Sequence, residues 1–335
     1  MFIFAFMNSK IGVIGNGSWA TAIVKMLTET QDEIYWWFRS RTSAKYLLEN
    51  EHNPNYLSSV EFDLEMLKVT TDINEIVSQC DYLILAVPSI YVTNAFKKLT
   101  IPLDNKFIFS AIKGIVPEDN MIVGDFLHKK YDVDYKNIGV ISGPCHAEEV
   151  AMERLSYLTI ACKQESQAQF IAQALSSDFI KTKISDDIFG TEYGTVLKNI
   201  YAIAAGIAHG LGYGDNFQAI LMSNAIREME NIVQQVHPID RNINNSAYLG
   251  DLLVTGYSFF SRNRMLGNML GKGYTVRSAI LEMSMVAEGY YASKGIHKIV
   301  KSKNINAPIS ETVYRILYKE KNPKREFEKL CDVLD

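Results

Sequence analysis

The sequence predicts an α/β domain built on a parallel sheet, followed by an all-α domain. In the first part, short continuous apolar runs alternate with polar or helically spaced segments, a pattern typical of parallel strands covered by helices on both faces. After about residue 187 the strand-like runs end, and apolar residues recur at helical spacing. We therefore expect two domains, residues 1–187 and 188–335, which suits a chain of 335 residues.

The expected elements follow this division. The strand-like runs of the first domain are the apolar run that opens 10–17 and ends there in a glycine-rich turn, and the runs at 34–38, 82–87, 107–112, 138–141, 158–161 and 179–184. Helices are expected in the second domain at 191–210, 216–236, 246–257, 275–295 and 309–320. The charge-rich tail from Lys319 to Lys329 is interpreted as a solvated helix face.

Composition and charge are those of a globular protein. Hydrophobic residues make up 47% of the chain and charged residues 21%, and the net charge of −4 gives no whole-chain attraction to nucleic acid or acidic membranes. The four cysteines are far apart, the histidines are scattered, and no His-Glu-x-x-His motif occurs. We therefore expect no metal site, no disulfide framework and a cytoplasmic location. No apolar run is long enough, and free enough of charge, to span a bilayer.

The first seven residues, MFIFAFM, are apolar but do not form a signal peptide. They lack a basic start, a long apolar run and a small-residue cleavage site. We interpret them as a short extension. The choice between Met1 and Met7 as the first residue stays open.

A glycine-rich turn follows the first apolar run. Residues 15–20, GNGSWA, match the pattern G-x-G-x-x-G/A between a strand and a helix. Gly15 allows the tight turn, and Gly17 lets the backbone approach a pyrophosphate, which would lie on the helix N-terminus. The alternative is a glycine turn kept only for packing. In this context, the motif predicts a Rossmann-type dinucleotide-binding domain.

The end of the second expected strand indicates which dinucleotide is used. An NAD site usually carries Asp or Glu there for the ribose 2′-hydroxyl, whereas this sequence has Phe38-Arg39-Ser40-Arg41. A guanidinium group can hold a 2′-phosphate through two hydrogen bonds. We predict that NADP(H) is preferred and that NAD(H) can also serve; two surface arginines are the alternative.

The chain resembles the bacterial-type NAD(P)-dependent glycerol-3-phosphate dehydrogenases over nearly its full length. The matching segments, in the family's order, are GNGSWATA (15–22), LAVPS (85–89), IKG (112–114), ISGP (141–144), VLKNIYAIAAGIAHGLGYGDN (196–216), LGDLLVT (249–255), SRNR (261–264) and VAEG (286–289). The resemblance implies interconversion of dihydroxyacetone phosphate and sn-glycerol 3-phosphate, supply of the latter for phospholipid synthesis, and a homodimer.

The motif and the resemblance together assign roles to individual residues. The expected catalytic residues are Lys198, Lys113 and Asp251. The expected cofactor-binding residues are Gly15, Gly17, Ser18, Trp19, Arg39, Tyr56, Lys113, Ala147, Arg262, Val286 and Glu288. The expected substrate-binding residues are Lys113, Gly143, Cys145, Lys198, Asn199, Asp251, Ser261, Arg262 and Asn263. The chain departs from the family at Cys145, where a hydroxyl residue is usual, and at Met265, where another arginine is frequent.

Lys198 suits proton transfer to a ketone oxygen. It lies in an apolar helix, so burial should lower its pKa toward the range useful for acid–base catalysis. Asp251, also in an apolar helix, is its natural partner, because an unpaired buried carboxylate is costly. From the residues alone, a structural ion pair stays open beside catalysis. Lys113, expected at the end of the strand at 107–112, could polarise the carbonyl, and an ordinary surface lysine is the alternative.

Arg262 and Asn263 carry the expectation about substrate. Arginine offers a phosphate two parallel hydrogen bonds, and asparagine adds an amide donor; a solvated turn is the alternative for this block. Two other functions remain open. One is a related two-domain dehydrogenase acting on a 3-hydroxyacid or a ketoacid, and the other is a non-catalytic sensor of NADP(H). The sensor would have no reason to place a lysine and an aspartate inside apolar helices.

Overall fold

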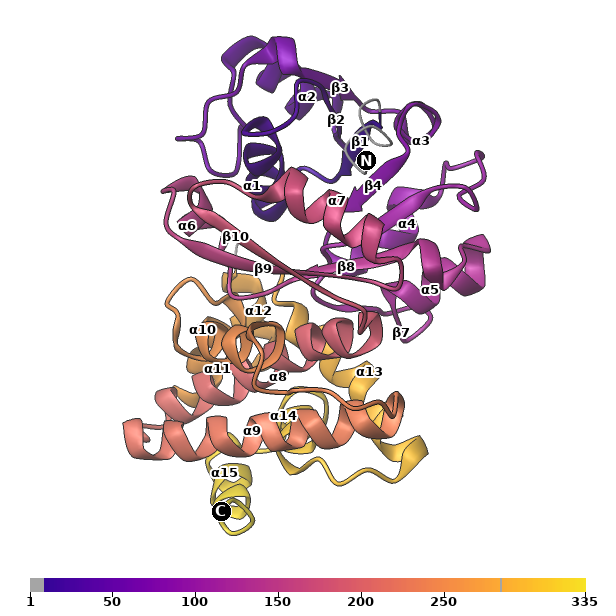
Figure 1. Ribbon diagram of the computed structural model, residues 1–335. Coiled ribbons are helices and arrows are strands. Elements are labelled where there is room, and N and C mark those ends of the chain that lie inside the picture. The colour runs from indigo at the N-terminus through magenta and orange to yellow at the C-terminus, as the bar shows by residue number, and fades with distance from the viewer. Residues whose placement is uncertain (1–8, 284) are drawn as a thin grey trace. The chain divides into compact units, whose positions relative to one another are not determined.

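The computed structural model describes residues 9–283 and 285–335, and the apolar extension at 1–7 lies outside this part of the chain. The chain divides into two compact units (Figure 1). One comprises residues up to Ile112 together with Val123–Ile188, and we call it the sheet unit. The other comprises Lys113–Ile122 and Phe189–Asp335, and we call it the helical unit.

The sheet unit is built on an eight-stranded sheet with the order β10-β9-β8-β5-β4-β1-β2-β3. Its strands are β1 (Ile11–Ile14), β2 (Ile34–Trp37), β3 (Leu67–Thr70), β4 (Tyr82–Leu85), β5 (Phe107–Ser110), β8 (Ile138–Ser142), β9 (Ser156–Cys162) and β10 (Ile180–Ser185). All seven apolar runs predicted as strands are confirmed. Strand β3 was not predicted, because only its two ends are buried and it reads as a polar segment.

The sheet is parallel except between β8 and β9, which pair antiparallel. Residues 143–155 contain only the short helix α6 (Ala147–Ala151), so the chain returns along the sheet in β9 itself instead of crossing over first. The strand order reverses between β1 and β4. In doubly wound sheets, ligands bind beyond the carboxyl ends of the strands at such a point.

Helices cover both faces of this sheet, as predicted. The remaining helices of the unit are α1 (Ser18–Thr28), α2 (Arg41–Asn50), α3 (Ile73–Gln79), α4 (Val92–Phe96), α5 (Val123–Tyr131) and α7 (Glu165–Leu175). Ile11, Val13 and Trp36 point into a core shared with α1 and α7. On the opposite face, the Cβ position of Gly12 lies within 3 Å of Ile76 and Cys80, so α3 packs directly on the strand.

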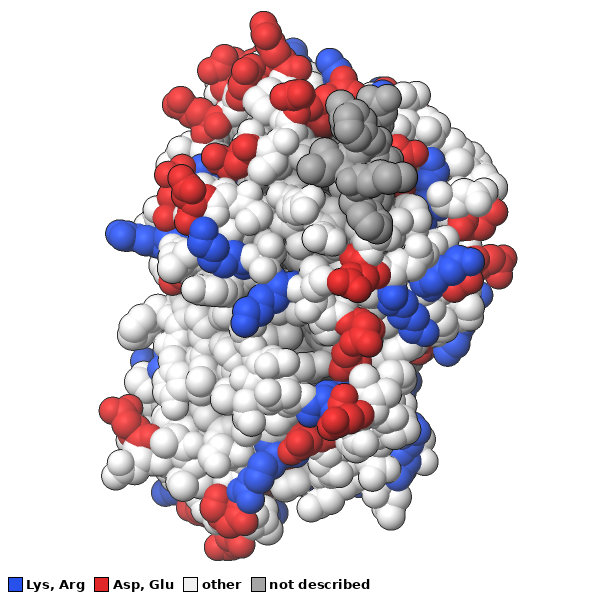
Figure 2. All heavy atoms as spheres, in the orientation of Figure 1, with Lys and Arg blue, Asp and Glu red and all other residues white. Residues whose placement is uncertain are grey.

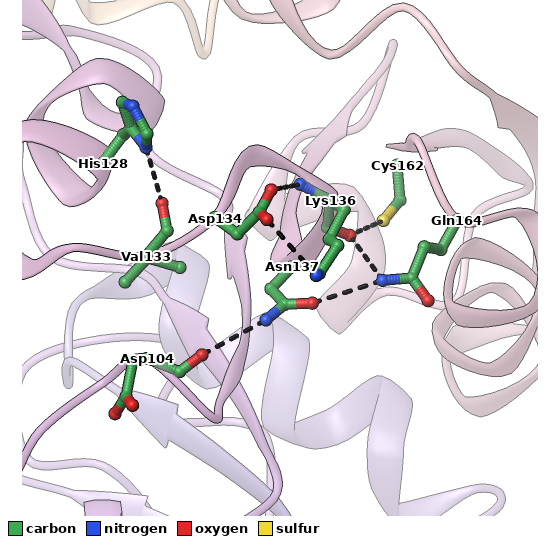
Figure 3. A network of polar contacts seen from close by, with 8 residues as sticks. All are labelled: Asp104, His128, Val133, Asp134, Lys136, Asn137, Cys162 and Gln164. Atoms are coloured by element: carbon green, nitrogen blue, oxygen red, sulfur yellow. Dashed lines mark hydrogen bonds and ion pairs between the residues drawn. The ribbon is translucent and has the colours of Figure 1, made fainter.

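A polar network fixes the start of β8 (Figure 3). The Gln164 amide donates to the Lys136 carbonyl and to Asn137 Oδ1, each at 3.2 Å. The Asn137 amide donates to the Asp104 carbonyl at 3.3 Å, and the Cys162 thiol lies 3.6 Å from the Lys136 carbonyl. These bonds satisfy backbone groups at the amino end of β8, opposite the edge where the glycine turn lies.

The helical unit takes in a short excursion of the chain from the sheet unit. Residues 113–122 form the hairpin β6 (Ile115–Val116) and β7 (Met121–Ile122), and Ile115 packs on Gly295 of α13 (Glu288–Lys303). Our prediction of one unbroken first domain missed this excursion. Two-residue strands carry too few residues for an alternation pattern to be read.

The other elements of this unit are helical. They are α8 (Ile188–Gly210), α9 (Asp215–Val236), a π-helical turn (Ser246–Gly250), α10 (Asp251–Tyr257), α11 (Arg262–Gly271), α12 (Val276–Glu282), α14 (Pro308–Lys319) and α15 (Pro323–Cys331). The single helix predicted at 275–295 is wrong: α12 ends at Glu282 and α13 starts at Glu288. The tail does form a helix, α15, and its solvated face is opposite the buried Phe327 and Leu330. Among the described helices, none is long and apolar enough to cross a membrane.

Helices α8 and α11 contact each other through their backbones. A Cβ on Gly206 would lie 2.1 Å from the Arg264 carbonyl oxygen, and a Cβ on Gly267 would lie 2.1 Å from the Ile203 carbonyl oxygen. No side chain fits at either position. The contact therefore fixes α11 against the carboxyl-terminal half of α8, the helix that carries Lys198 further toward its start.

Candidate active site

In the sheet unit, the glycine turn has the geometry that its motif predicts. Gly15 has φ of 131° and packs against the Ala86 carbonyl, where a Cβ would lie 2.6 Å from the oxygen. Gly17, at the start of α1, differs: apart from its chain neighbours, no described atom lies within 4 Å of where its Cβ would be. Packing thus explains Gly15 but not Gly17. The open space at Gly17 fits a dinucleotide pyrophosphate lying on the N-terminus of α1.

Two side chains, Trp36 and Asn53, hold this turn in place. The Trp36 indole donates to the Gly15 carbonyl at 2.7 Å. The wholly buried Asn53 amide donates to the Asn16 carbonyl at 3.1 Å and to Thr21 Oγ1 at 2.9 Å. The turn is therefore preorganised before any ligand binds. Tyr56, a predicted cofactor contact, is half-buried three residues beyond Asn53.

Arg39 follows β2 and is exposed, with its guanidinium 5.2 Å from the ring centroid of Tyr91. Arg41 is instead the first residue of α2, where Ser40 caps the helix by accepting the Ser43 N–H. Since β2 pairs with β1, Arg39 lies at the same sheet edge as the glycine turn. The aromatic ring beside it limits the directions that the guanidinium can take.

The turn after β8 is also tight. Gly143 has φ of 127°, and a Cβ there would lie 2.6 Å from the Tyr157 carbonyl oxygen. Cys145 and Ala147 follow and are buried in the core shared with α1. The thiol of Cys145 is thus part of the packing, and its contact with substrate stays a prediction.

In the helical unit, a buried ion pair joins α8 to α10. The Lys198 ammonium donates to Asp251 Oδ1, and both side chains are at least 96% buried. Burial lowers the pKa of Lys198 to about 7, the neighbouring positive charge of Lys113 acts in the same direction, and Asp251 opposes both. Lys198 can therefore both give and take a proton near neutral pH.

Lys113 belongs to the helical unit, which corrects its predicted position at the end of a strand. Strand β5 ends at Ser110, and Lys113 begins the excursion that packs with the helices. Its carbonyl accepts the Asn199 amide at 2.7 Å, and its charge acts on Lys198. The chain reversal at 113–122 thus brings Lys113 to the lysine on α8.

The Ser-Arg-Asn-Arg block starts a helix and is not a solvated turn. Ser261 caps α11 by accepting the Arg264 N–H at 3.2 Å. Asn263 Oδ1 accepts the Gly289 N–H at 2.9 Å, at the start of α13 beside Glu288. Ser261 and Asn263 are buried, whereas Arg262 is half-buried. The oxygen of Ser261 therefore caps α11 and that of Asn263 joins α11 to α13, whereas Arg262 carries the only charge among these three residues.

The starts of α11 and α13 meet α8 beside the lysine. A Cβ on Gly289 would lie 2.5 Å from the Asn199 carbonyl oxygen. Val286, a predicted cofactor contact, is half-buried just before α13. Lys198, Asn199, Asn263 and Glu288 therefore belong to one local cluster in which Gly289 allows the close approach.

Comparison with known proteins decides the family. The family models for the NAD-dependent glycerol-3-phosphate dehydrogenase N-terminus and C-terminus match residues 10–168 and 187–328. The chain belongs to this family. It is 34% identical to the glycerol-3-phosphate dehydrogenase [NAD(P)+] of Oceanobacillus iheyensis over 324 residues, covering 96% of this chain and 94% of that protein.

Two further relatives support the assignment. The protein of the same name from Staphylococcus haemolyticus is 33% identical, covering 95% of this chain and 96% of its own. The crystal structure of glycerol-3-phosphate dehydrogenase from Coxiella burnetii superposes with a TM-score of 0.88 at 26% identity, over 97% of this chain and 99% of that one. The resemblance and the fold class predicted from the sequence are thus confirmed.

Three candidate residues of this glycerol-3-phosphate dehydrogenase family member were missed in the sequence. Asn53 holds the glycine turn, Tyr91 lies beside Arg39, and the buried Thr255 donates to the Asp251 carbonyl at 2.7 Å. Of these three, only Thr255 could have been found from the sequence, because it stands one helical turn after Asp251. Asn53 lies in an irregular segment and Tyr91 ends a three-residue 3₁₀-helix (Ser89–Tyr91), and neither is long enough for spacing to give information. Among the described residues, no group of three or more His, Cys, Asp or Glu side chains could hold a metal ion.

Proposed function

We propose that this protein transfers hydride reversibly between NAD(P)H and dihydroxyacetone phosphate, giving sn-glycerol 3-phosphate. The observation that carries the proposal is the buried Lys198–Asp251 pair, in which the pKa of the lysine falls to about 7. Family membership and the named activity of its relatives support the same reaction. The reaction fits a role in supplying glycerol 3-phosphate for phospholipids.

The dinucleotide would lie on the glycine turn, with its pyrophosphate over Gly17 and α1, and it supplies the hydride when bound. Lys198 then donates its proton to the ketone oxygen, and in the reverse direction its neutral amine accepts the hydroxyl proton. Asp251 positions the ammonium and keeps it from losing its proton too early. Lys113 adds a second positive charge that stabilises the developing alkoxide.

We assign the substrate phosphate to Arg262. Arg262 is half-buried as the first residue of α11, and the block that carries it matches the family's substrate-side segment. An arginine in such surroundings suits a dianionic phosphate better than a point charge would. Ser261 and Asn263 support it by fixing the helix start.

We assign cofactor preference to Arg39. It stands where an NAD enzyme usually has a carboxylate, and its accessible guanidinium suits the 2′-phosphate of NADPH. We accordingly propose NADP(H) as the preferred cofactor, with NAD(H) as a weaker alternative. A cytoplasmic location and a homodimer are also proposed, on the strength of the composition and the family.

One assay tests the reaction against its alternatives. NADPH absorbance is followed with dihydroxyacetone phosphate and, in parallel, with a panel of ketoacids. We expect turnover with the phosphorylated ketone and little with the ketoacids. Turnover with a ketoacid alone would move the protein to the related dehydrogenases, and NADPH binding without any turnover would favour the sensor.

A further inference from the structure

Helix α13 carries two glycines that let other segments of the helical unit approach it closely. A Cβ on Gly289, in the first turn, would lie 2.5 Å from the Asn199 carbonyl oxygen on α8. A Cβ on Gly295 would lie 2.8 Å from Cδ1 and 3.1 Å from Cγ2 of Ile115, on the hairpin β6–β7. At a rise of about 1.5 Å per residue, the two contacts lie about 9 Å apart along the helix. Both the helix that carries Lys198 and the hairpin that follows Lys113 therefore pack directly on α13.

The contact at Gly295 gives a reason for a glycine in the middle of α13. Glycine destabilises a helix interior relative to alanine, so a buried glycine there needs a local explanation. Ile115 is 1% exposed and pairs with Ile122, which is equally buried, and both belong to the hydrophobic core of the helical unit. The close approach of Ile115 supplies the explanation, and the hairpin is a fixed part of this core.

A third contact joins α8 to the hairpin directly. The Asn199 amide donates to the Lys113 carbonyl at 2.7 Å. Asn199 follows Lys198 in α8, and Ile115 stands two residues after Lys113. The contacts α13–α8, α13–hairpin and α8–hairpin thus form a closed set, so no one of the three segments can shift without disturbing the other two.

We propose that α13 sets the spacing between Lys198 and Lys113, and that Gly295 is the positioning residue for Lys113. This inference rests on the proposed function, in which Lys198 transfers the proton and Lys113 stabilises the developing alkoxide. A larger residue at 295 would displace Ile115 and, two residues earlier, Lys113. The bond from Asn199 to the Lys113 carbonyl would then lengthen, and the second charge would move relative to the first.

The charges around Lys198 decide what such a displacement does. Burial is the main cause of its lowered pKa, the charge of Lys113 acts in the same direction, and Asp251 opposes both. The other charged groups that the neighbouring helices α9, α11 and α13 bring to this region are Glu228, Arg262 and Glu288, and the variants below leave them in place. Figure 2 shows mostly uncharged surface over α10, the helix of Asp251, and over α11. Moving Lys113 away should therefore raise the pKa of Lys198, because a like charge no longer opposes its ammonium form as strongly.

The variant Gly295→Val tests the spacing. In the wild type, kcat for ketone reduction should fall as pH rises through the pKa of Lys198, which is about 7. In the variant we expect this fall to move to higher pH by about half a unit or more. Adding Ile115→Ala removes as many carbon atoms as the valine adds, so the double variant should return the fall toward its wild-type pH.

The matched control is Gly210→Ala at the end of α8. Its new Cβ would meet the Asn268 carbonyl oxygen and so crowd a helix contact that does not include the hairpin. Both Gly210→Ala and Gly295→Val should lower the melting temperature, but only Gly295→Val should move the pH at which kcat falls. If Gly295→Val does not fold, Gly295→Ala is the milder variant and is judged by the same criterion.

A titration without substrate separates this inference from the proposed reaction. The pKa of Lys198 is followed by NMR in protein labelled with ¹³Cε-lysine, and Lys198→Arg identifies its signal. We expect the same upward shift in Gly295→Val. If this shift occurs but the wild type does not reduce dihydroxyacetone phosphate, the proposed reaction fails and the positioning role stands. An unshifted titration in the folded Gly295 variant, or an equal shift in Gly210→Ala, would overturn the positioning role.

Discussion

The candidate functional residues of the two units use different chemistry. In the sheet unit, the turn at Gly15–Gly17 depends on the absence of side chains: a Cβ at Gly15 would meet the Ala86 carbonyl, and Gly17 leaves open space at the start of α1. In the helical unit, the site depends on buried side-chain charges, with Lys198 and Asp251 withdrawn from solvent. A backbone site tolerates most changes around it but not an added Cβ. A buried charge site is sensitive to the loss of one functional group, because the partner is left unpaired.

The largest expected effect is on turnover when Lys198 is removed. Lys198→Ala should lower kcat by about 100-fold or more, the usual size of a general acid–base contribution. NADPH binding should change little, because the glycine turn belongs to the sheet unit. Steady-state kinetics and a fluorescence titration of NADPH measure the two effects. If the folded variant keeps a near-normal kcat, Lys198 does not transfer the proton and forms only a structural ion pair with Asp251.

The pH dependence sharpens this test. Ketone reduction needs the ammonium of Lys198, so kcat for reduction should fall as pH rises through about 7, whereas kcat for glycerol 3-phosphate oxidation should rise over the same range. Asp251 raises the pKa of Lys198. Asp251→Asn should therefore move both transitions to lower pH. If neither transition shifts in this variant, Asp251 is not the residue that positions Lys198 and raises its pKa.

Arg262→Ala should have the next largest effect. Removing one charged partner of the phosphate should cost about 2–4 kcal/mol in transition-state binding. Unphosphorylated dihydroxyacetone should already be a poor substrate, and the variant should change its kcat/KM far less. Arg262→Lys should not restore activity, because a point charge cannot form two parallel hydrogen bonds. If both ketones slow by the same factor, Arg262 is not the phosphate anchor and Lys113 becomes the candidate.

The same difference explains how many of each unit's functional residues could be predicted from the sequence. The glycine turn is local, so Gly15, Gly17 and the flanking strand and helix could be recognised within a dozen residues. The charge pair joins residues 53 positions apart, and only the family resemblance favoured catalysis over a structural pair. The position of Lys113 was wrong because a two-strand hairpin, too short to show a pattern, carries it into the other unit.

The helical unit also depends on the backbone contact between α8 and α11, and Gly206→Ala tests that contact. The new Cβ would meet the Arg264 carbonyl oxygen at 2.1 Å, and a backbone atom cannot turn away as a side chain can. Overpacking of this kind should destabilise the protein by about 1–3 kcal/mol. The control is Gly214→Ala, since beyond the chain neighbours no described atom lies within 4 Å of that Cβ. Equal melting temperatures for both variants would show that α11 can move away from α8 without loss.

The smallest expected effect is on cofactor selection by the sheet unit. It separates what the backbone of the glycine turn contributes to cofactor binding from what the Arg39 side chain contributes. Arg39→Ala should lower kcat/KM for NADPH by about tenfold, because one exposed charge-assisted contact to the 2′-phosphate is lost. The value for NADH should hardly change, because the glycine turn proposed to hold the pyrophosphate stays intact. Tyr91→Leu should show a weaker form of the same selective loss if the ring orients the guanidinium. Rising salt should narrow the wild-type gap between the two cofactors, since an exposed charge is screened. An equal loss for both cofactors would instead place Arg39 on the adenine. A wild-type preference for NADH would show that the sheet unit selects its cofactor through the backbone of the glycine turn alone.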